Sequence, residues 1–296
     1  MPSSTPSEPA VAAPASGEDG RVGRGTARRA SPRRNGPERR RRSLLHKAER
    51  AWWVFLGACA CVAIWAYLAG GQQEYMLPGP DKTARALGSI LSTSDFWSAL
   101  GQTIGRALTG LAIAIVGGVA WGSAIGKSLH LDWLCRSLLQ ILLSTPAVIF
   151  VIIGIVWFEG NSAVVVFVVA IVTTPLLTTA TASAVRAIDT DLVEMARIFG
   201  LGRMKTAWRV TFPMVAVPVL AAATVALGQS IRVSVMAELL STASGMGGAI
   251  RLAQINIETP QIFAYAVVMT AVTFTLEAVF VAPIRGRLQA HRVAGA

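Results

Sequence analysis

Two long stretches without a formal charge constrain this chain more than any other feature of its sequence. They cover residues 161–185 and 210–231, which are 25 and 22 residues long. About 20 apolar residues of helix cross the ~30 Å hydrocarbon core of a bilayer. Only helices and closed barrels satisfy their backbone hydrogen bonds in lipid, so each stretch predicts a spanning helix. The polar segment between them, residues 186–213, must then lie outside the membrane.

Similar charge-free runs recur along the chain and predict six spanning helices. The composition agrees, with 53% hydrophobic residues, 15% charged residues and a mean hydropathy of +0.54. The expected fold is therefore an all-α polytopic membrane protein. The expected spans are Ala51–Gln73, Ala107–Gly126, Ser137–Phe158, Asn161–Val185, Val210–Ile231 and Thr259–Ile284, the last of which is broken only by Glu277. The corresponding divisions are a tail (1–50), a first spanning helix (51–73), an extracytoplasmic segment (74–103) and a core domain (104–292).

The positive charges predict the orientation of these spans. With the N-terminus inside, the inner segments hold 22 of the 27 Lys and Arg residues. Basic residues accumulate on the cytoplasmic side, so we expect both termini in the cytoplasm and the chain in the cell membrane. Residues 1–50 hold 12 of these cations and little apolar surface, which predicts a disordered basic tail. Arg39–Arg42 would also suit nucleic acid, but attraction to membrane lipid is the favoured interpretation and no nucleic-acid partner is expected.

The polar segment between the fourth and fifth spans has the pattern of an ordered element. Asp191 is expected to cap a helix in which Glu194 reaches back to the cap. Gly200 and Gly202 are placed to end this helix. Residues 205–210 then predict a second short helix that leads to Pro213. A capped helix–Gly–helix on the inner face of a membrane protein favours a docking surface over a simple connector.

Residues 232–258 are too broken by small and polar side chains to span a membrane, and they predict a re-entrant or cavity-lining segment. For Glu277, snorkelling or pairing with Arg285 is favoured over a proton relay. Gly118, Gly122 and Gly126 share one helix face, where packing within the chain is favoured over a subunit contact. The candidate pathway-lining residues are Arg232, Glu238, Ser241, Ser244 and Gly245.

Catalytic patterns are absent from the sequence. The three histidines all fall in expected cytoplasmic segments, so no span offers a nucleophile–histidine pair. There is no phosphate-binding GxxxxGK[ST] motif and no cysteine or histidine spacing typical of a metal site. We therefore expect a non-catalytic chain with no cofactor and no metal, which does not itself hydrolyse ATP.

Several motifs in residues 75–290 together resemble the membrane subunits of ABC importers. The segment with Glu194-Met195-Ala196, Gly200 and Phe212-Pro213 resembles the EAA loop of that family. Two further stretches resemble the nitrate/sulfonate/taurine-type permeases, a group of binding-protein-dependent inner-membrane components. They are Thr145-Pro146-Ala147 with Ile155-Val156-Trp157-Phe158, and Met236-Ala237-Glu238-Leu239-Leu240 with Ser244-Gly245-Met246-Gly247. Met195 replaces the usual first alanine, and Arg232 stands where an uncharged or aromatic residue is expected.

The resemblance implies one half of a type I importer that works as a homodimer. A separate ATPase would bind the coupling loop 186–211, and an extracytoplasmic binding protein would deliver a small, anionic solute such as a sulfonate, nitrate or taurine. The implied ATPase-coupling residues are Asp191, Glu194, Ala196, Gly200, Gly202 and Pro213. A stand-alone carrier or channel remains the alternative, and a membrane scaffold that uses the basic tail is a third possibility.

Overall fold

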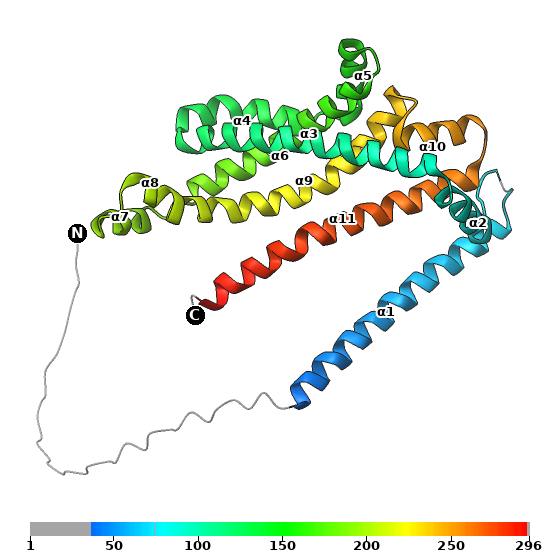
Figure 1. Ribbon diagram of the computed structural model, residues 1–296, viewed down its shortest axis with the longest axis horizontal. Coiled ribbons are helices and arrows are strands. Elements are labelled where there is room, and N and C mark those ends of the chain that lie inside the picture. Colours follow the sequence, from blue (N-terminus) through cyan, green and yellow to red (C-terminus); the bar gives the residue numbers. More distant parts are fainter. Residues whose placement is uncertain (1–36, 74, 295–296) are drawn as a thin grey trace, which may run out of the picture. The chain divides into compact units, whose positions relative to one another are not determined.

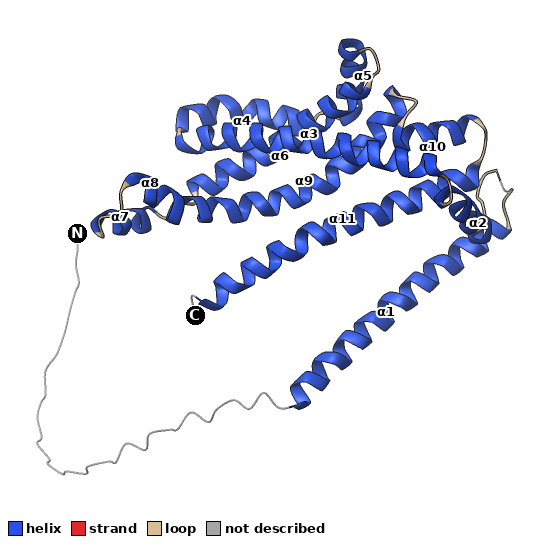
Figure 2. Ribbon diagram, in the orientation of Figure 1, coloured by secondary structure: helices blue, strands red, loops and turns tan. Residues whose placement is uncertain are grey.

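The computed structural model describes residues 37–73 and 75–294, and the side chains of Glu49, 52–73 and 75–279 within them. Every regular element in these ranges is helical (Figure 2), as the sequence predicts. The chain divides into two units, residues 1–57 and 58–296. The predicted disorder of residues 1–36 lies outside the described part of the chain. Residues 37–50, predicted to belong to the tail, are already helical.

The first helix, α1 (Pro37–Gly70), crosses the boundary predicted at residue 50. Its apolar portion, Trp52–Gly70, is long enough to span a bilayer, and none of it is buried. Two tryptophans, Trp52 and Trp53, begin this portion, and aromatic rings of this kind gather at membrane interfaces. Most of its side chains are exposed, which suits a helix in contact with lipid, and Trp65 stacks on Phe263 with ring centroids 5.9 Å apart.

The second unit holds the remaining helices, which Figure 1 labels along the chain. Long helices α3, α6, α9 and α11 form its body, and the shorter helices lie at their ends. The bounds are α2 (Pro80–Leu91), α3 (Ser94–Lys127), α4 (Leu129–Ser144), α5 (Ala147–Phe158), α6 (Ser162–Arg186), α7 (Thr190–Ile198), α8 (Arg203–Thr206), the π-helical turn η1 (Ala207–Thr211), α9 (Phe212–Ser241), α10 (Gly245–Ile255) and α11 (Thr259–Ala294).

Five described helices are long and apolar enough to cross a membrane, and the bent pair α4–α5 makes a sixth span when it is counted as one. The predicted third span, Ser137–Phe158, covers only the second half of α4 and all of α5, and the axes of these two helices meet at 93°. Pro146 causes the break because it cannot donate a backbone hydrogen bond and forces Thr145 out of helical geometry. Thr145 accordingly has an extended backbone with ψ of 126°.

The fifth span differs most from its prediction. It was expected to end at Ile231, but α9 continues to Ser241, and the spanning stretch runs from Arg203 to Ser241. The separate short helix predicted for residues 205–210 is also wrong, because α8 and η1 lead into α9 without leaving helical geometry. The lone charge of Arg232 was taken as a span end, whereas it lies within the helix and pairs with Glu277 on α11.

The centre of the second unit is the contact between α3 and α6, with α9 against both. An added Cβ at Gly118 would stand 2.7 Å from Leu177 Cβ, and one at Gly122 would stand 2.5 Å from the Thr178 carbonyl oxygen. Gly126 meets Val185 in the same way. These glycines therefore let the two helices approach closely, which confirms that their shared face packs within the chain.

The adjacent glycines Gly117 and Gly118 provide a direct test of this contact. An added Cβ at Gly117 meets nothing within 4 Å. We expect Gly118→Ala to lower the free energy of unfolding by about 1–3 kcal/mol, because the methyl group has no room. Gly117→Ala is expected to be neutral or stabilising by up to about 1 kcal/mol, since alanine favours helix. Thermal unfolding in detergent measures both, and equal effects would contradict the close α3–α6 contact.

Candidate functional site

The polar segment after α6 folds into the helical knob formed by α7 and α8, residues 190–206. The cap of α7 is Asp189, whose carboxylate accepts a hydrogen bond from the Asp191 N–H at 2.9 Å. The prediction that Asp191 caps the helix is therefore wrong by two residues. Asp191 lies in the first turn, where its carboxylate still interacts favourably with the positive end of the helix dipole. Glu194 is exposed and makes no hydrogen bond or ion pair within the described chain, so the predicted capping box does not form.

The end of α7 follows the prediction for Gly200. This residue has φ of 72°, in the left-handed region that suits glycine. The Gly200 N–H donates to the Arg197 carbonyl at 2.9 Å, and the Leu201 N–H donates to the Ala196 carbonyl at 3.0 Å. This Schellman arrangement reverses the chain tightly and satisfies the last carbonyls of α7. Gly202 then precedes the first turn of α8 instead of ending α7.

Apolar side chains on the knob face outward. Ala196 packs inside it, but Ile198 is 82% exposed and Phe199 is 78% exposed. Met204 on α8 and Trp208 on η1 are also largely exposed. Pro213, the last of the predicted coupling residues, lies at the start of α9 directly after the π-helical turn η1. Exposed large apolar side chains beside a capped helix are typical of a surface that can bind another molecule.

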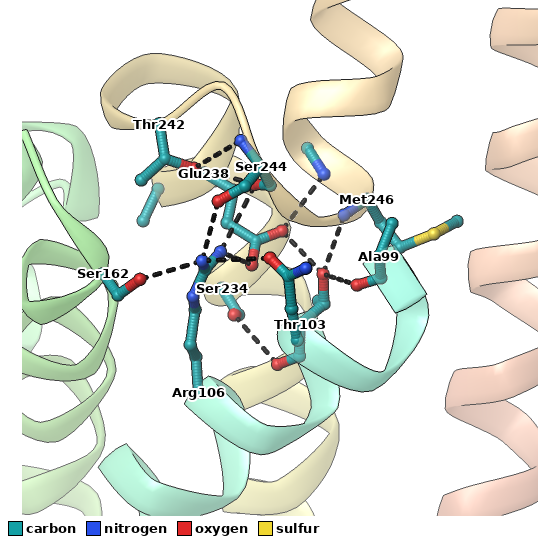
Figure 3. Close-up of polar contacts among 12 residues, drawn as sticks. Ala99, Thr103, Arg106, Ser162, Ser234, Glu238, Thr242, Ser244 and Met246 are labelled. Carbon is teal, nitrogen blue, oxygen red and sulfur yellow. Dashed lines mark hydrogen bonds and ion pairs between the residues drawn. The ribbon is translucent and has the colours of Figure 1, made fainter. Parts of the chain in front are cut away.

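At the opposite end of α9, Glu238 forms a buried ion pair with Arg106 of α3 (Figure 3). The Arg106 Nη1 to Glu238 Oε1 distance is 2.7 Å, and the two side chains are 11% and 0% exposed. The Arg106 guanidinium also donates to the Ser162 hydroxyl at 2.9 Å and to the Ser244 hydroxyl at 2.8 Å. One side chain of α3 thus contacts the start of α6, the end of α9 and the cap position of α10.

Glu238 and Thr103 together cap the first turn of α10. The second carboxylate oxygen of Glu238 accepts from the Gly247 N–H at 3.1 Å and from the Thr103 hydroxyl at 2.7 Å. The Thr103 oxygen accepts in turn from the Met246 N–H at 2.8 Å. These first-turn N–H groups have no partner inside their own helix. A carboxylate at this position also interacts favourably with the positive end of the helix dipole.

The glycines in the first turn of α10 are explained by this contact. An added Cβ at Gly245, which has φ of 83°, would stand 2.5 Å from the Glu238 carboxylate. At Gly247 it would stand 2.5 Å from Glu238 Cβ, and at Gly248 2.5 Å from the Ala243 backbone. Residues 232–258 are therefore two helices joined by a tight turn.

The predicted pathway-lining residues fall into two groups in the structure. Glu238, Ser244 and Gly245 belong to the buried cluster, and Ser241 donates to its own helix at the Ala237 carbonyl. Arg232 lies apart from them and pairs with Glu277. The sequence analysis did not predict Arg106 and Thr103 as site residues. Arg106 could have been found, because a single arginine beside a charge-free run indicates a functional or paired charge. A cavity of 520 Å³ adjoins the cluster between α2, α3, α10 and α11, with Asp95, Gln102, Ser244, Gln261 and Tyr265 among its lining residues.

A further ion pair, Arg232–Glu277, joins α9 and α11. The Arg232 Nη2 to Glu277 Oε1 distance is 3.3 Å, with side chains 72% and 31% exposed. Pairing of Glu277 with Arg285 was predicted instead, but the side chain of Arg285 lies outside the described residues. Gly228, one turn before Arg232, leaves room for the Glu277 carboxylate, which an added Cβ would strike. Cavities of 400 and 570 Å³ both border this pair.

The comparison with protein families agrees with this arrangement of spans and knob. Residues 114–285 match the family described as the binding-protein-dependent transport system inner membrane component. The chain belongs to this family. It is thus a permease of the ABC importer type, and a membrane protein with several spanning helices.

Curated relatives of this permease are named for different substrates. It is 28% identical over 210 residues to the riboflavin transport system permease protein RibX of Chloroflexus aurantiacus, which covers 70% of this chain and 77% of the relative. It is 27% identical over 198 residues to the putative aliphatic sulfonates transport permease protein SsuC of Escherichia coli K12, covering 66% and 74%. The nitrate import permease protein NrtB of Leptolyngbya laminosa is 26% identical over 152 residues, covering 51% and 54%.

Solved structures show the same fold at lower sequence identity. An amino acid ABC transporter crystallised with histidines is similar with a TM-score of 0.53 and 17% identity, covering 67% of the permease and 95% of that chain. An inward-facing structure of the MetNI methionine ABC transporter has a TM-score of 0.50 and 18% identity, covering 64% and 93%. The helical architecture is therefore that of type I importer permeases.

The buried pair of this permease is expected to be essential for stability. Arg106→Ala leaves the Glu238 carboxylate buried and unpaired, which should cost about 3–5 kcal/mol of unfolding free energy. Arg85→Ala is the matched control, because Arg85 pairs with Asp81 at 2.7 Å on the exposed surface of α2. There Arg85 lowers the pKa of Asp81 by hydrogen bonding, yet exposed pairs stabilise little.

Thermal unfolding in detergent measures both arginine variants. The double variant Arg106→Met with Glu238→Gln should recover part of the loss, because it removes the unpaired charge along with the pair. If Arg106→Ala is no more harmful than Arg85→Ala, the buried cluster does not hold the α10 end of the bundle together.

Proposed function

We propose that this permease is the membrane-spanning half of an ATP-driven importer and binds a separate ATPase through the α7–α8 knob. Two copies of the chain form the pathway for a small solute. The observation that carries this proposal is the knob itself, a capped helix that reverses at Gly200 and exposes Ile198 and Phe199. Family membership supports the same function, because the family is defined by binding-protein-dependent transport.

The charges around the knob support a cytoplasmic position for it. Arg197, Arg203, Lys205 and Arg209 all lie within or beside α7, α8 and η1. By the positive-inside bias this end of α6 and α9 faces the cytoplasm, where ATP is available. With six alternating spans, this orientation supports a cytoplasmic position for both termini. It also supports an outer position for the 520 Å³ cavity beside α10, where a solute-binding protein would deliver its cargo.

The solute is proposed to be small and to carry an anionic group. Arg232 supports this choice, because its guanidinium is open to the cavities beside it and presents several donors to an acid group. Two relatives are named as permeases for aliphatic sulfonates and for nitrate, and a third is named as a riboflavin permease. A non-catalytic role follows from the same assignment, since the partner ATPase supplies the hydrolysis.

A stand-alone carrier is less well supported by the ionisable groups in the spans. Glu238 and Glu277, the two carboxylates described within spanning helices α9 and α11, are each paired with an arginine. A proton-coupled carrier would use carboxylates that gain and lose a proton in the membrane. Because each of these carboxylates already has an arginine partner, neither is a free group for such a relay.

Affinity purification of the tagged permease from its native membrane tests the proposed function. We expect an ATP-binding subunit to co-purify in stoichiometric amount. Phe199→Asp should reduce its recovery by about tenfold or more, because a charge at the centre of an apolar contact is costly. Met76→Asp is the matched control, since Met76 is also exposed but precedes α2 at the other end of the bundle.

Recovery with Met76→Asp should equal that of the wild type. If no ATPase co-purifies with intact wild-type permease, the importer proposal is overturned and the carrier or channel becomes the better reading. If Phe199→Asp retains the ATPase fully, the knob is not the docking surface.

A further inference from the structure

Two ion pairs of the permease, Arg106–Glu238 and Arg232–Glu277, differ in a way that separates a structural role from a binding role. Arg106 and Glu238 are almost wholly buried, 2.7 Å apart, and further hydrogen bonds satisfy both. Arg232 and Glu277 are 3.3 Å apart, with 72% and 31% of their side chains exposed. A pair built for stability is dry and fully satisfied, whereas the Arg232–Glu277 pair is open and weakly joined.

The open pair lies along spanning helices, where an exposed charge cannot face lipid at low cost. Arg232 is roughly nine residues, or about 13 Å of helix, before the end of α9. Glu277 lies within the span Thr259–Val279 on α11. The face of α9 and α11 that carries both charges must therefore border a water-filled space or another protein chain.

The backbone beneath the pair is shaped to hold it. Gly228 allows the Glu277 carboxylate to lie against α9, and an added Cβ there would strike one carboxylate oxygen and stand 3.3 Å from Arg232 Nη2. Only one N–H of the Arg232 guanidinium donates to a described residue, through Nη2 to Glu277. A guanidinium offers five N–H donors, so several remain available to a ligand.

The two adjoining cavities offer complementary polar groups. Thr270 and Thr273 border the 400 Å³ cavity, and each donates its hydroxyl proton to its own helix. Their oxygens can then act only as acceptors, as the Glu277 carboxylate does. The 570 Å³ cavity has the Gln229 amide beside Arg232. Cavities of a few hundred Å³ suit small organic solutes.

We propose that the Arg232–Glu277 pair is the membrane-embedded binding site for a small zwitterion, a solute with an acid group and an ammonium group a few ångströms apart. The acid group binds Arg232, and the ammonium group binds Glu277 and the threonine oxygens beside it. A simple anion would meet repulsion from Glu277, and a simple cation would meet repulsion from Arg232. This inference rests on the proposed function, in which α9 and α11 line the pathway, and it narrows the anionic solute to one that also carries a cation.

Three probes of nearly equal size test the charge preference. They are β-alanine as the zwitterion, propionate as the anion and n-propylammonium as the cation. Each is offered at equal concentration to the purified full-length chain in lipid nanodiscs, and saturation-transfer NMR measures bound probe. Wild type should prefer β-alanine over either singly charged probe by about tenfold, because only the zwitterion pairs with both side chains.

Single-charge variants should change this preference in opposite directions. Arg232→Gln should shift it toward n-propylammonium, and Glu277→Gln should shift it toward propionate. Arg251→Gln is the matched control, because Arg251 is an exposed cation on α10 that borders neither cavity. Gly228→Ala keeps both charges but displaces the Glu277 carboxylate, so it should weaken β-alanine binding as well.

The charge exchange Arg232→Glu with Glu277→Arg guards against variants that fail to fold, because it restores an opposite pair. It should retain the β-alanine preference. The proposal is overturned if wild type binds no probe, if it binds all three equally, or if both single variants keep the wild-type preference for β-alanine. ATPase co-purification is scored separately, so a failed importer proposal and a failed zwitterion site give different results.

Discussion

The arrangement of the α10 end of the bundle depends on how the first turn of α10 is capped. Its Met246 and Gly247 N–H groups lie among packed helices, where an unsatisfied donor is costly. Thr103 and Glu238 accept from these groups, and Arg106 neutralises the carboxylate that does so. The cap therefore brings α3, α9 and α10 together through hydrogen bonds that none of these helices could make alone. The same cap explains Gly245 and Gly247, since a side chain at either position would strike Glu238.

Arginine and glutamate form two pairs that involve α9, and the two pairs serve different purposes. Glu238 is dry and has a full set of donors, so its pair with Arg106 holds backbone in place. Glu277 is partly exposed beside Arg232, so its charge remains available to a solute. Desolvation decides between these roles, because a buried pair gains by staying closed whereas an exposed pair exchanges readily with water or a ligand.

Local patterns in the sequence predicted most of the fold and less of the site. Charge-free runs located the spans, and the glycine spacing on α3 identified a packed face, because both signals arise within one helix. The end of the fifth span was wrong, since Arg232 is tolerated by a partner 45 positions later in the chain. Arg106 was missed for the same reason, with Glu238 132 positions away. Asp189 and Asp191 are both able to cap α7, and the backbone conformation at residue 189 decided between them.

Under the proposed function, α9 is the element that connects the ATPase to the solute. The helical stretch from Arg203 to Ser241 covers about 58 Å at 1.5 Å per residue, and it begins in the knob and ends at Glu238. The π-helical turn at Ala207–Thr211 and the internal Pro218 both lie in its first half, where a helix bends most easily. The second half carries Gly228, Arg232 and Glu238, and is held against α3 and α10 by the cap. A movement of the knob would therefore bend α9 below Pro218 and reach the Arg232–Glu277 pair as a displacement of α9 relative to α11, which is the change that opens or closes a site shared by those two helices.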